Sequence, residues 1–195
     1  MNILIINGSV RQAQATRNAT NWVQKTANSV LGGANVSVID LKELAMPMFD
    51  EATLPMMNKD RQPEGSVKTW LEALDDADGY VFVTPEYNHG VPAGLKSAID
   101  YINFQIMHKP FLVVSHGANG GARSAEQLKG ILNANIGGLP VPSGVTINGM
   151  VGFQNLISED GEILDEATKS NQATLESKLQ ELSSLAEALQ AARAQ

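Results

Sequence analysis

The chain opens with NILIINGSVRQAQATRN (2–18), an apolar run followed by a polar, basic turn. The apolar run is continuous rather than alternating, which is typical of a strand covered on both faces of a sheet. Gly8 permits a turn with unusual dihedral angles, and a helix is predicted from Thr16. Backbone amides at a helix N-terminus favour an anion, and Arg11 and Arg17 add positive charge. The stretch therefore predicts a strand, a turn and a helix that together hold an anion.

The same alternation of apolar runs and helical patterns continues along the chain. Strands are predicted at 2–7, 35–40, 79–84, 110–116 and 139–147, and helices at 16–30, 66–77, 92–103, 122–135 and 167–192. Alternation of this kind indicates a parallel sheet with right-handed crossovers. We expect one flavodoxin-like α/β domain over 1–195, doubly wound, with strand order 2-1-3-4-5 and helices on both faces. Its ligand site would lie at the carboxyl ends of strands 1, 3 and 4.

Two late segments depart from the regular pattern. Pro140 and Pro142 lack the N–H that a ladder needs, so 139–147 should be an edge strand or start late. Asp160 and Gly161 lie between short apolar runs and could form a small hairpin turn.

Composition narrows the classes of function. The 195 residues carry a formal net charge of −7, which argues against a general nucleic-acid binder but not against one small anionic ligand. The chain has no cysteine, which excludes disulfides, thiolate metal sites and a cysteine nucleophile. We predict no metal site. No signal-like N-terminal segment or membrane-length apolar run is present, so we expect a cytoplasmic protein that contacts no membrane.

The loop after the third predicted strand reads PEYNHG (85–90). Pro85 and Pro92 fix the backbone at its two ends. Tyr87 and Asn88 offer a ring and an amide that could meet a planar heterocycle. His89 is a conceivable base, but local packing or capping is the better interpretation.

The loop after the fourth predicted strand reads SHGANGGAR (115–123), where glycines let the backbone approach a ligand closely. It is not GxGxxG, and no P-loop signature occurs, which disfavours nucleoside triphosphates. Three polar motifs thus follow three strands that should meet at one crevice. A phosphate grip, a planar platform and a close backbone approach together describe a phosphorylated flat cofactor, and FMN fits this description.

The sequence also resembles the NAD(P)H-dependent FMN reductases, a flavodoxin-like family that includes quinone, azo-dye and chromate reductases. The resemblance runs from residue 2 to about 165 and is carried by GSVR (8–11), MPMFDE (46–51), DADGYVFVTPEYNHGVPAGLKSAIDY (76–101) and SHGANGGARSAEQLK (115–129). It implies that Ser9 and Arg11 hold the FMN phosphate. It further implies an isoalloxazine contact at Pro85, Glu86, Tyr87 and Asn88 and a flanking loop of Ser115, Gly117, Gly120 and Gly121.

The chain departs from the family pattern at two places. Many relatives have Gly-Ser-x-Asn where this chain has QAQATRN (12–18), so the third phosphate donor is open, with Gln14 and Thr16 as candidates. Gly90 stands where relatives usually have Ser.

The resemblance implies an oxidoreductase that passes hydride from NADPH or NADH to bound FMN by a ping-pong mechanism. The acceptor would be a quinone, an azo compound, a metal oxyanion or free flavin. Because the cofactor carries this chemistry, we expect no catalytic residue on the protein. The alternatives are a flavodoxin-type electron carrier without a substrate pocket and a domain that binds another phosphorylated ligand.

Apolar residues in two connecting segments suggest self-association. Met48, Phe49, Met56 and Met57 lie in the long 41–65 connection, and Phe104, Ile106 and Met107 lie in the 103–109 segment. We expect both groups to reach the carboxyl edge of the sheet and to form the contact of a homodimer or homotetramer. The alternative is that these residues complete the core of their own domain.

Overall fold

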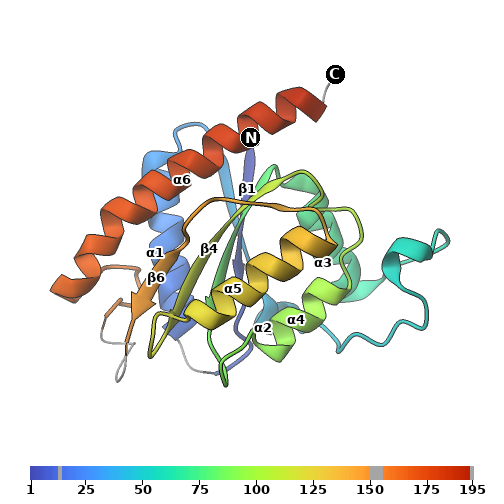
Figure 1. Cartoon of the computed structure of the whole chain (residues 1–195), viewed down its shortest axis with the longest axis horizontal. Coiled ribbons are helices and arrows are strands. Elements are labelled where there is room, and N and C mark those ends of the chain that lie inside the picture. Colours follow the sequence, from blue (N-terminus) through green and yellow to red (C-terminus); the bar gives the residue numbers. More distant parts are fainter. Residues whose placement is uncertain (13–14, 150–155, 194–195) are drawn as a thin grey trace.

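A computed structural model describes residues 1–12, 15–149 and 156–193, and its central element is a parallel sheet (Figure 1). The strands are β1 (Asn2–Asn7), β2 (Asn35–Asp40), β3 (Gly79–Pro85), β4 (Pro110–Gly117), β5 (Leu139–Pro140) and β6 (Val145–Asn148). Their order is β2-β1-β3-β4-β5, with β6 also paired to β4, and every pair is parallel. The predicted doubly wound order is confirmed.

Helices cover both faces of the sheet, as the apolar runs predicted (Figure 1). One face packs against α1 (Ala15–Val30) and α6 (Glu166–Arg193), and the other against α3 (Gly65–Asp76), α4 (Ala93–Asp100) and α5 (Ala122–Gly130). Successive strand residues therefore alternate between two cores: Ile5 faces α1, whereas Leu4 and Ile6 face α3 and α4. The helix α5 continues into a short π-helical turn, Ile131–Asn135.

The predicted strand over 139–147 is two short strands instead of one. β5 pairs with the start of β4, and β6 pairs with its end. Between them the Val141 amide still donates to the Phe111 carbonyl at 2.8 Å, but Pro142 has no N–H to donate and Ser143 has a φ of 57°. The expected edge position is confirmed, and the proline-rich middle explains why the ladder is interrupted.

The long connection between β2 and α3 contains α2 (Leu41–Leu44) and a 3₁₀ turn (Pro55–Met57), which the sequence patterns did not reveal. It is anchored to the domain at several points. Arg61 donates to Glu51 Oε1 at 2.6 and 2.9 Å and to the Tyr101 carbonyl at 2.9 Å. The Phe49 ring packs edge-on against Tyr101, and its amide donates to Ser97 Oγ at 2.7 Å. The segment is thus a packed part of the domain with an exposed outer surface.

The segment 156–164 is a small hairpin, as Asp160 and Gly161 suggested. Ile157 and Ile163 form an antiparallel bridge, and the Leu164 amide donates to the Leu156 carbonyl at 2.8 Å. The hairpin lies on α1, where Asn18 donates to the Ile157 carbonyl at 2.8 Å.

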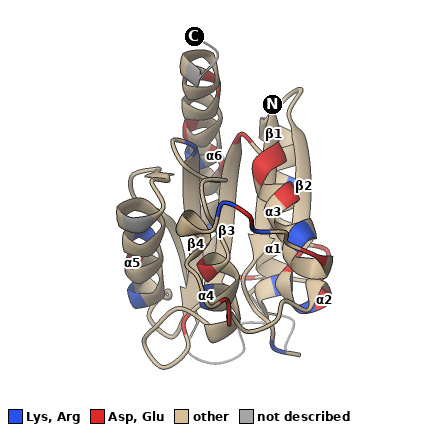
Figure 2. Cartoon of the chain, turned by 90° about the vertical axis from the view of Figure 1, so that its right-hand side faces the viewer, with Lys and Arg blue, Asp and Glu red and all other residues tan. Residues whose placement is uncertain are grey.

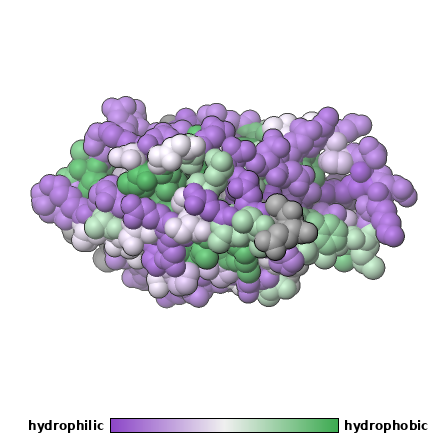
Figure 3. Space-filling model, turned by 90° about the horizontal axis from the view of Figure 1, so that it is seen from above, coloured by the Kyte–Doolittle hydropathy of each residue, from purple (hydrophilic) through white to green (hydrophobic). Residues whose placement is uncertain are grey.

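The charged residues are interspersed along the side of the molecule drawn in Figure 2. Seen from above, the surface is mainly hydrophilic with separate apolar patches (Figure 3). Within the described ranges, no helix is long and apolar enough to cross a membrane.

Candidate functional site

The loop after β1 lies against the end of β3. The Gly8 amide donates to the Val83 carbonyl at 2.9 Å. A Cβ atom at Gly8 would lie 2.8 Å from the Leu95 side chain and 3.0 Å from that carbonyl oxygen, so the close approach requires glycine. After this contact the chain crosses the carboxyl edge of the sheet and enters α1.

A small polar hollow lies where this loop meets the end of β2. It is lined by Asn7, Ser9, Arg11, Thr16, Arg17, Asp40 and Lys42. Asp40 accepts from Asn7 Nδ2 at 2.9 Å and from Arg17 at 3.1 Å, and Arg17 also contacts Glu43 at 2.5 Å. The hydrogen bond and charge of Asp40, with a further contribution from Glu43, raise the pKa of Arg17 above its usual value. Arg11 forms no ion pair with any residue in the described ranges, so its charge remains available to a ligand.

The PEYNHG loop is a tight two-residue turn. Tyr87 and Gly90 exchange backbone hydrogen bonds of 3.1 and 3.0 Å, and Asn88 and His89 have φ values of 49° and 67°. Positive φ at both central residues defines a type I′ turn. Asn88 is exposed at its tip, and so is His89, for which the sequence predicts local packing or capping.

Tyr87 joins the first two predicted motifs. Its hydroxyl lies 2.8 Å from Ser9 Oγ, and the Arg11 guanidinium carbon lies 5.4 Å from the centre of its ring. The Ser9 hydroxyl also accepts from the Arg11 amide at 3.3 Å. The predicted phosphate grip and the predicted ring platform are therefore in direct contact.

The Glu86 carboxylate faces α5. It accepts from the Arg123 backbone amide at 3.0 Å and from the Arg123 side chain at 3.1 Å, at the start of that helix. Burial alone would raise the pKa of Glu86, but these hydrogen bonds outweigh burial and lower it. Pro85, which ends β3, is buried. The Glu86 carboxylate is thus held by the start of α5.

The glycine loop after β4 folds back on its own strand. Ser115 Oγ donates to the Gly120 carbonyl at 2.6 Å, and Gly120 and Gly121 have φ values of 68° and 71°. A Cβ atom at Gly121 would lie 2.7 Å from the His116 carbonyl oxygen. Gly117 accepts from the Gly149 amide at 3.0 Å, so the end of β6 braces the loop.

The structure adds a contact that the sequence reasoning missed. Thr16 Oγ1 lies 2.9 Å from Nε2 of His116, and both residues are buried. Burial lowers the pKa of His116 to about 4, so its imidazole is neutral at pH 7. One sequence feature could have pointed to His116: it lies between Ser115 and Gly117, two residues already predicted to belong to the site. Gln14, the other candidate for the third donor, lies outside the described residues.

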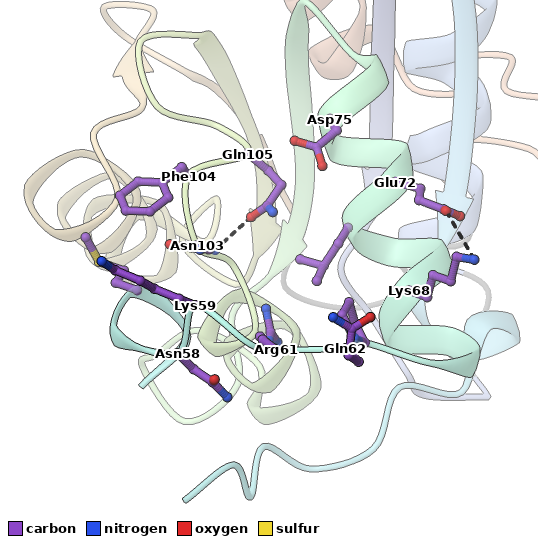
Figure 4. Close-up of a pocket in the computed structure, with 13 residues that line it drawn as sticks. Asn58, Lys59, Arg61, Gln62, Lys68, Glu72, Asp75, Asn103, Phe104 and Gln105 are labelled. Atoms are coloured by element: carbon purple, nitrogen blue, oxygen red, sulfur yellow. Dashed lines mark hydrogen bonds and ion pairs between the residues drawn. The ribbon is translucent and has the colours of Figure 1, made fainter. Parts of the chain in front are cut away.

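A second, larger hollow of about 700 Å³ lies between α3, the 56–63 segment and the 103–105 segment (Figure 4). Met56, Leu71 and Phe104 form its apolar part, and Lys59 and Arg61 are among its polar residues. Within the described ranges, no group of three or more His, Asp or Glu residues could hold a metal ion, here or elsewhere.

We predicted that the 103–109 segment reaches the carboxyl edge of the sheet, and this prediction is wrong. The Gln105 carbonyl accepts from the Tyr80 hydroxyl at 3.1 Å, and the Lys109 ammonium donates to the last turn of α3. Both contacts lie near the amino ends of the strands, because the segment leads directly into the start of β4 in a parallel sheet. Ile106 is fully buried, whereas Phe104 is 50% exposed.

A doubly wound parallel sheet with a polar hollow and a glycine loop at its carboxyl edge defines a flavodoxin-like protein. The model of the NADPH-dependent FMN reductase family matches residues 1–151. The chain belongs to this family. Membership confirms the predicted resemblance, with FMN as cofactor and NAD(P)H as co-substrate of the family.

Individual relatives agree with this assignment. An NAD(P)H-dependent FMN reductase of Schizosaccharomyces pombe is 39% identical over 127 residues, which cover 65% of this chain and 63% of that protein. A quinone reductase of Escherichia coli is 37% identical over 130 residues, which cover 60% and 66%. This chain thus spans a little under two thirds of the length of both relatives. The solved structure of a flavoenzyme NAD(P)H:(acceptor) oxidoreductase from Paracoccus denitrificans shares the fold, with a TM-score of 0.73, 22% identity and coverage of 94% and 97%.

Proposed function

We propose that this protein is an FMN-dependent oxidoreductase that oxidises NAD(P)H and reduces a small-molecule acceptor. The observation that carries the proposal is the contact between Ser9 and Tyr87 at 2.8 Å, which joins an anion hollow to a turn that can support a planar ring. FMN has both a phosphate and a planar ring, and the residues at the strand ends fit both parts.

The chain's own residues would bind and orient the cofactor. Arg11 would supply a planar charged fork and Ser9 a hydroxyl to the phosphate. The backbone of the turn around Tyr87 and Asn88 would support the ring from one side, and the Gly120–Gly121 turn would approach it from another. When bound, FMN supplies hydride chemistry, so no side chain needs to act as a base.

The acceptor would be a quinone or a similar small molecule, and the two substrates would use the same site in turn. The names of the relatives support this class, because one is a quinone reductase and another an FMN reductase. We place the reaction in the cytoplasm, where a nicotinamide co-substrate is supplied.

A visible spectrum of the purified protein tests the proposal. Bound FMN should bleach within seconds of adding NADPH or NADH without oxygen, and a quinone should restore the colour. Initial rates at several concentrations of both substrates should give the parallel double-reciprocal lines of a ping-pong mechanism. Bound FMN that neither nucleotide bleaches would indicate an electron carrier, and a protein that binds no FMN would indicate another ligand.

We also propose that the active form is a homodimer or homotetramer. Met48, Leu54, Met56, Met57 and Phe104 are all at least 49% exposed. Met56 and Phe104 line the same hollow, so part of this surface is continuous. An apolar surface of this kind is typical of a protein contact.

A further inference from the structure

Thr16 and His116 form a buried pair behind the anion hollow. Their exposed fractions are 3% and 6%, and Thr16 Oγ1 lies 2.9 Å from His116 Nε2. Thr16 is the second residue of α1 and lines the hollow. His116 is near the end of β4, two residues after Val114, which faces α1. The imidazole thus contacts the helix from the side of the sheet.

The direction of this hydrogen bond decides what Thr16 can offer a ligand. A neutral imidazole has one N–H, on either nitrogen. If Nε2 is bare, Thr16 donates its proton to His116 and presents only lone pairs to the hollow. If Nε2 carries the proton, His116 donates to Thr16 Oγ1, and the hydroxyl proton is free to point into the hollow. Burial keeps the imidazole neutral, so these two arrangements are the relevant ones.

The hollow favours the second arrangement when it holds an anion. Arg11, Arg17 and Lys42 line it together with Asp40, whose charge is paired with Arg17, and it lies at the first turn of α1. Lone pairs directed at a phosphate would repel it, whereas a hydroxyl donor to a charged acceptor forms a strong hydrogen bond. An anionic ligand should therefore select the tautomer with the proton on Nε2.

We propose that His116 is a positioning residue that donates from Nε2 to Thr16 and so directs the Thr16 hydroxyl proton to the FMN phosphate. Thr16 then supplies a third phosphate donor in addition to Ser9 and Arg11. This inference rests on the proposed function, because it takes the hollow to be the phosphate site of FMN.

The test compares FMN with riboflavin, which has the same ring and no phosphate. Apoprotein is titrated with each ligand, and flavin fluorescence reports binding. Thr16→Val removes the hydroxyl and keeps the shape, whereas Thr16→Ser keeps the hydroxyl. His116→Leu removes the donor, whereas His116→Gln places an amide N–H near the position of Nε2. Circular dichroism of each variant shows that it is folded.

Thr16→Val and His116→Leu should each weaken FMN binding by roughly tenfold or more, the effect of losing a hydrogen bond to a charged group. Both should change riboflavin binding by less than about twofold, given the near-identical shape of the site. Thr16→Ser and His116→Gln should keep most of the preference for FMN. The double variant should be no weaker than the worse single variant, because both changes remove the same donor.

Three results would overturn the inference: equal losses for FMN and riboflavin, additive losses in the double variant, or an unchanged preference for FMN in Thr16→Val. Nitrogen NMR of His116 adds a readout independent of affinity, since Nε2 should be protonated in the FMN complex. A bare Nε2 there would also overturn it. If the proposed function itself were wrong, the result would differ from these three: the wild-type protein would bind FMN no better than riboflavin.

Discussion

Arg11 lines the hollow and, like Lys42, has no ion-pair partner among the described residues, and we expect Arg11 to bind the phosphate of FMN. Arg11→Ala should weaken FMN binding by about 1.5–3 kcal/mol, the usual contribution of a charge-assisted hydrogen bond. Riboflavin binding should change little, and Arg11→Lys should lie between wild type and alanine. Titration of the apoproteins measures all of these affinities. Unchanged FMN affinity in Arg11→Ala would remove Arg11 from the phosphate site.

His116 should make the stability of the apoprotein depend on pH. Its pKa falls from 6.5 to about 4 on folding because it is buried. The unfolded chain therefore takes up a proton near pH 6.5, which the folded protein resists until about pH 4. The free energy of unfolding should fall across this interval by about 3 kcal/mol, which is the pKa difference converted at 1.36 kcal/mol per unit.

Urea denaturation between pH 4 and 7 measures this dependence. His116→Gln should flatten the pH profile, and replacement of the exposed His89 by Gln is the matched control that should leave it unchanged. If the unfolding free energy of His116→Gln depended on pH as steeply as that of the wild type, His116 would not be the cause of this dependence.

Single residues show what sequence can and cannot predict about the site. Ser9, Arg11 and the glycines stand directly after apolar runs, so a local pattern was enough to select them. Thr16 and His116 are 100 positions apart, and their contact depends on how α1 lies over the end of β4. No local pattern contains that information. Glu86 was selected as a contact of the flavin ring, but its hydrogen bond to the start of α5 is again a contact between distant segments.

The turn from β4 into α5 should tolerate an added methyl group poorly. In Gly121→Ala, a Cβ at a φ of 71° would lie 2.7 Å from the His116 carbonyl oxygen. We expect a loss of about 2–4 kcal/mol in stability, since strain and steric overlap add. FMN binding should also weaken.

Gly130→Ala is the matched control, because Gly130 ends α5 and has open space around its Cβ position. This change should be neutral or stabilise the protein by up to about 1 kcal/mol, the helix preference for alanine over glycine. Urea denaturation of both variants makes the comparison. Equal effects of the two substitutions would show that the Gly120–Gly121 turn is not constrained as the structure indicates.

The anchor of the long connection is also a testable element. The Arg61 side chain is 9% exposed and contacts Glu51, whose side chain is 23% exposed. Arg61→Ala should cost about 2–4 kcal/mol, because it leaves a largely buried carboxylate without its cation. Lys68→Ala, which removes an exposed pair with Glu72, should cost less than about 0.5 kcal/mol. Chemical denaturation distinguishes them, and similar small losses in both would contradict an anchoring role.

Strands and long helices followed from the sequence because their apolar patterns are strong and local. The 139–147 segment was harder, since its prolines signalled an edge but not where the pairing would resume. α2 and the Pro55–Met57 turn are too short to produce a periodic pattern. The 103–109 segment was misplaced although it directly precedes β4, because a segment that enters a parallel strand lies at the amino edge of the sheet.

At the scale of the whole molecule, the exposed apolar surface predicts self-association. Light scattering at micromolar concentration should give at least the mass of a dimer. Met56→Asp and Phe104→Asp should each shift the mass toward the monomer, because an unpaired charge in a contact is unfavourable. Leu164→Asp is the control, since Leu164 is 59% exposed on the hairpin that lies on α1. A wild-type monomer with full FMN occupancy and activity would rule out the dimer as the active form.

The interrupted edge at β5 and β6 has a consequence for behaviour at high concentration. A long, regular edge strand offers a row of free amides and carbonyls on which another chain can add a strand and start aggregation. Here Pro140 and Pro142 supply no amide, and the Val141 amide is already bonded to Phe111. Among the described residues, the short β6 is what remains as a regular ladder at this edge. The prolines that made this segment hard to assign from sequence thus act as a built-in protection against growth of the sheet beyond a single chain.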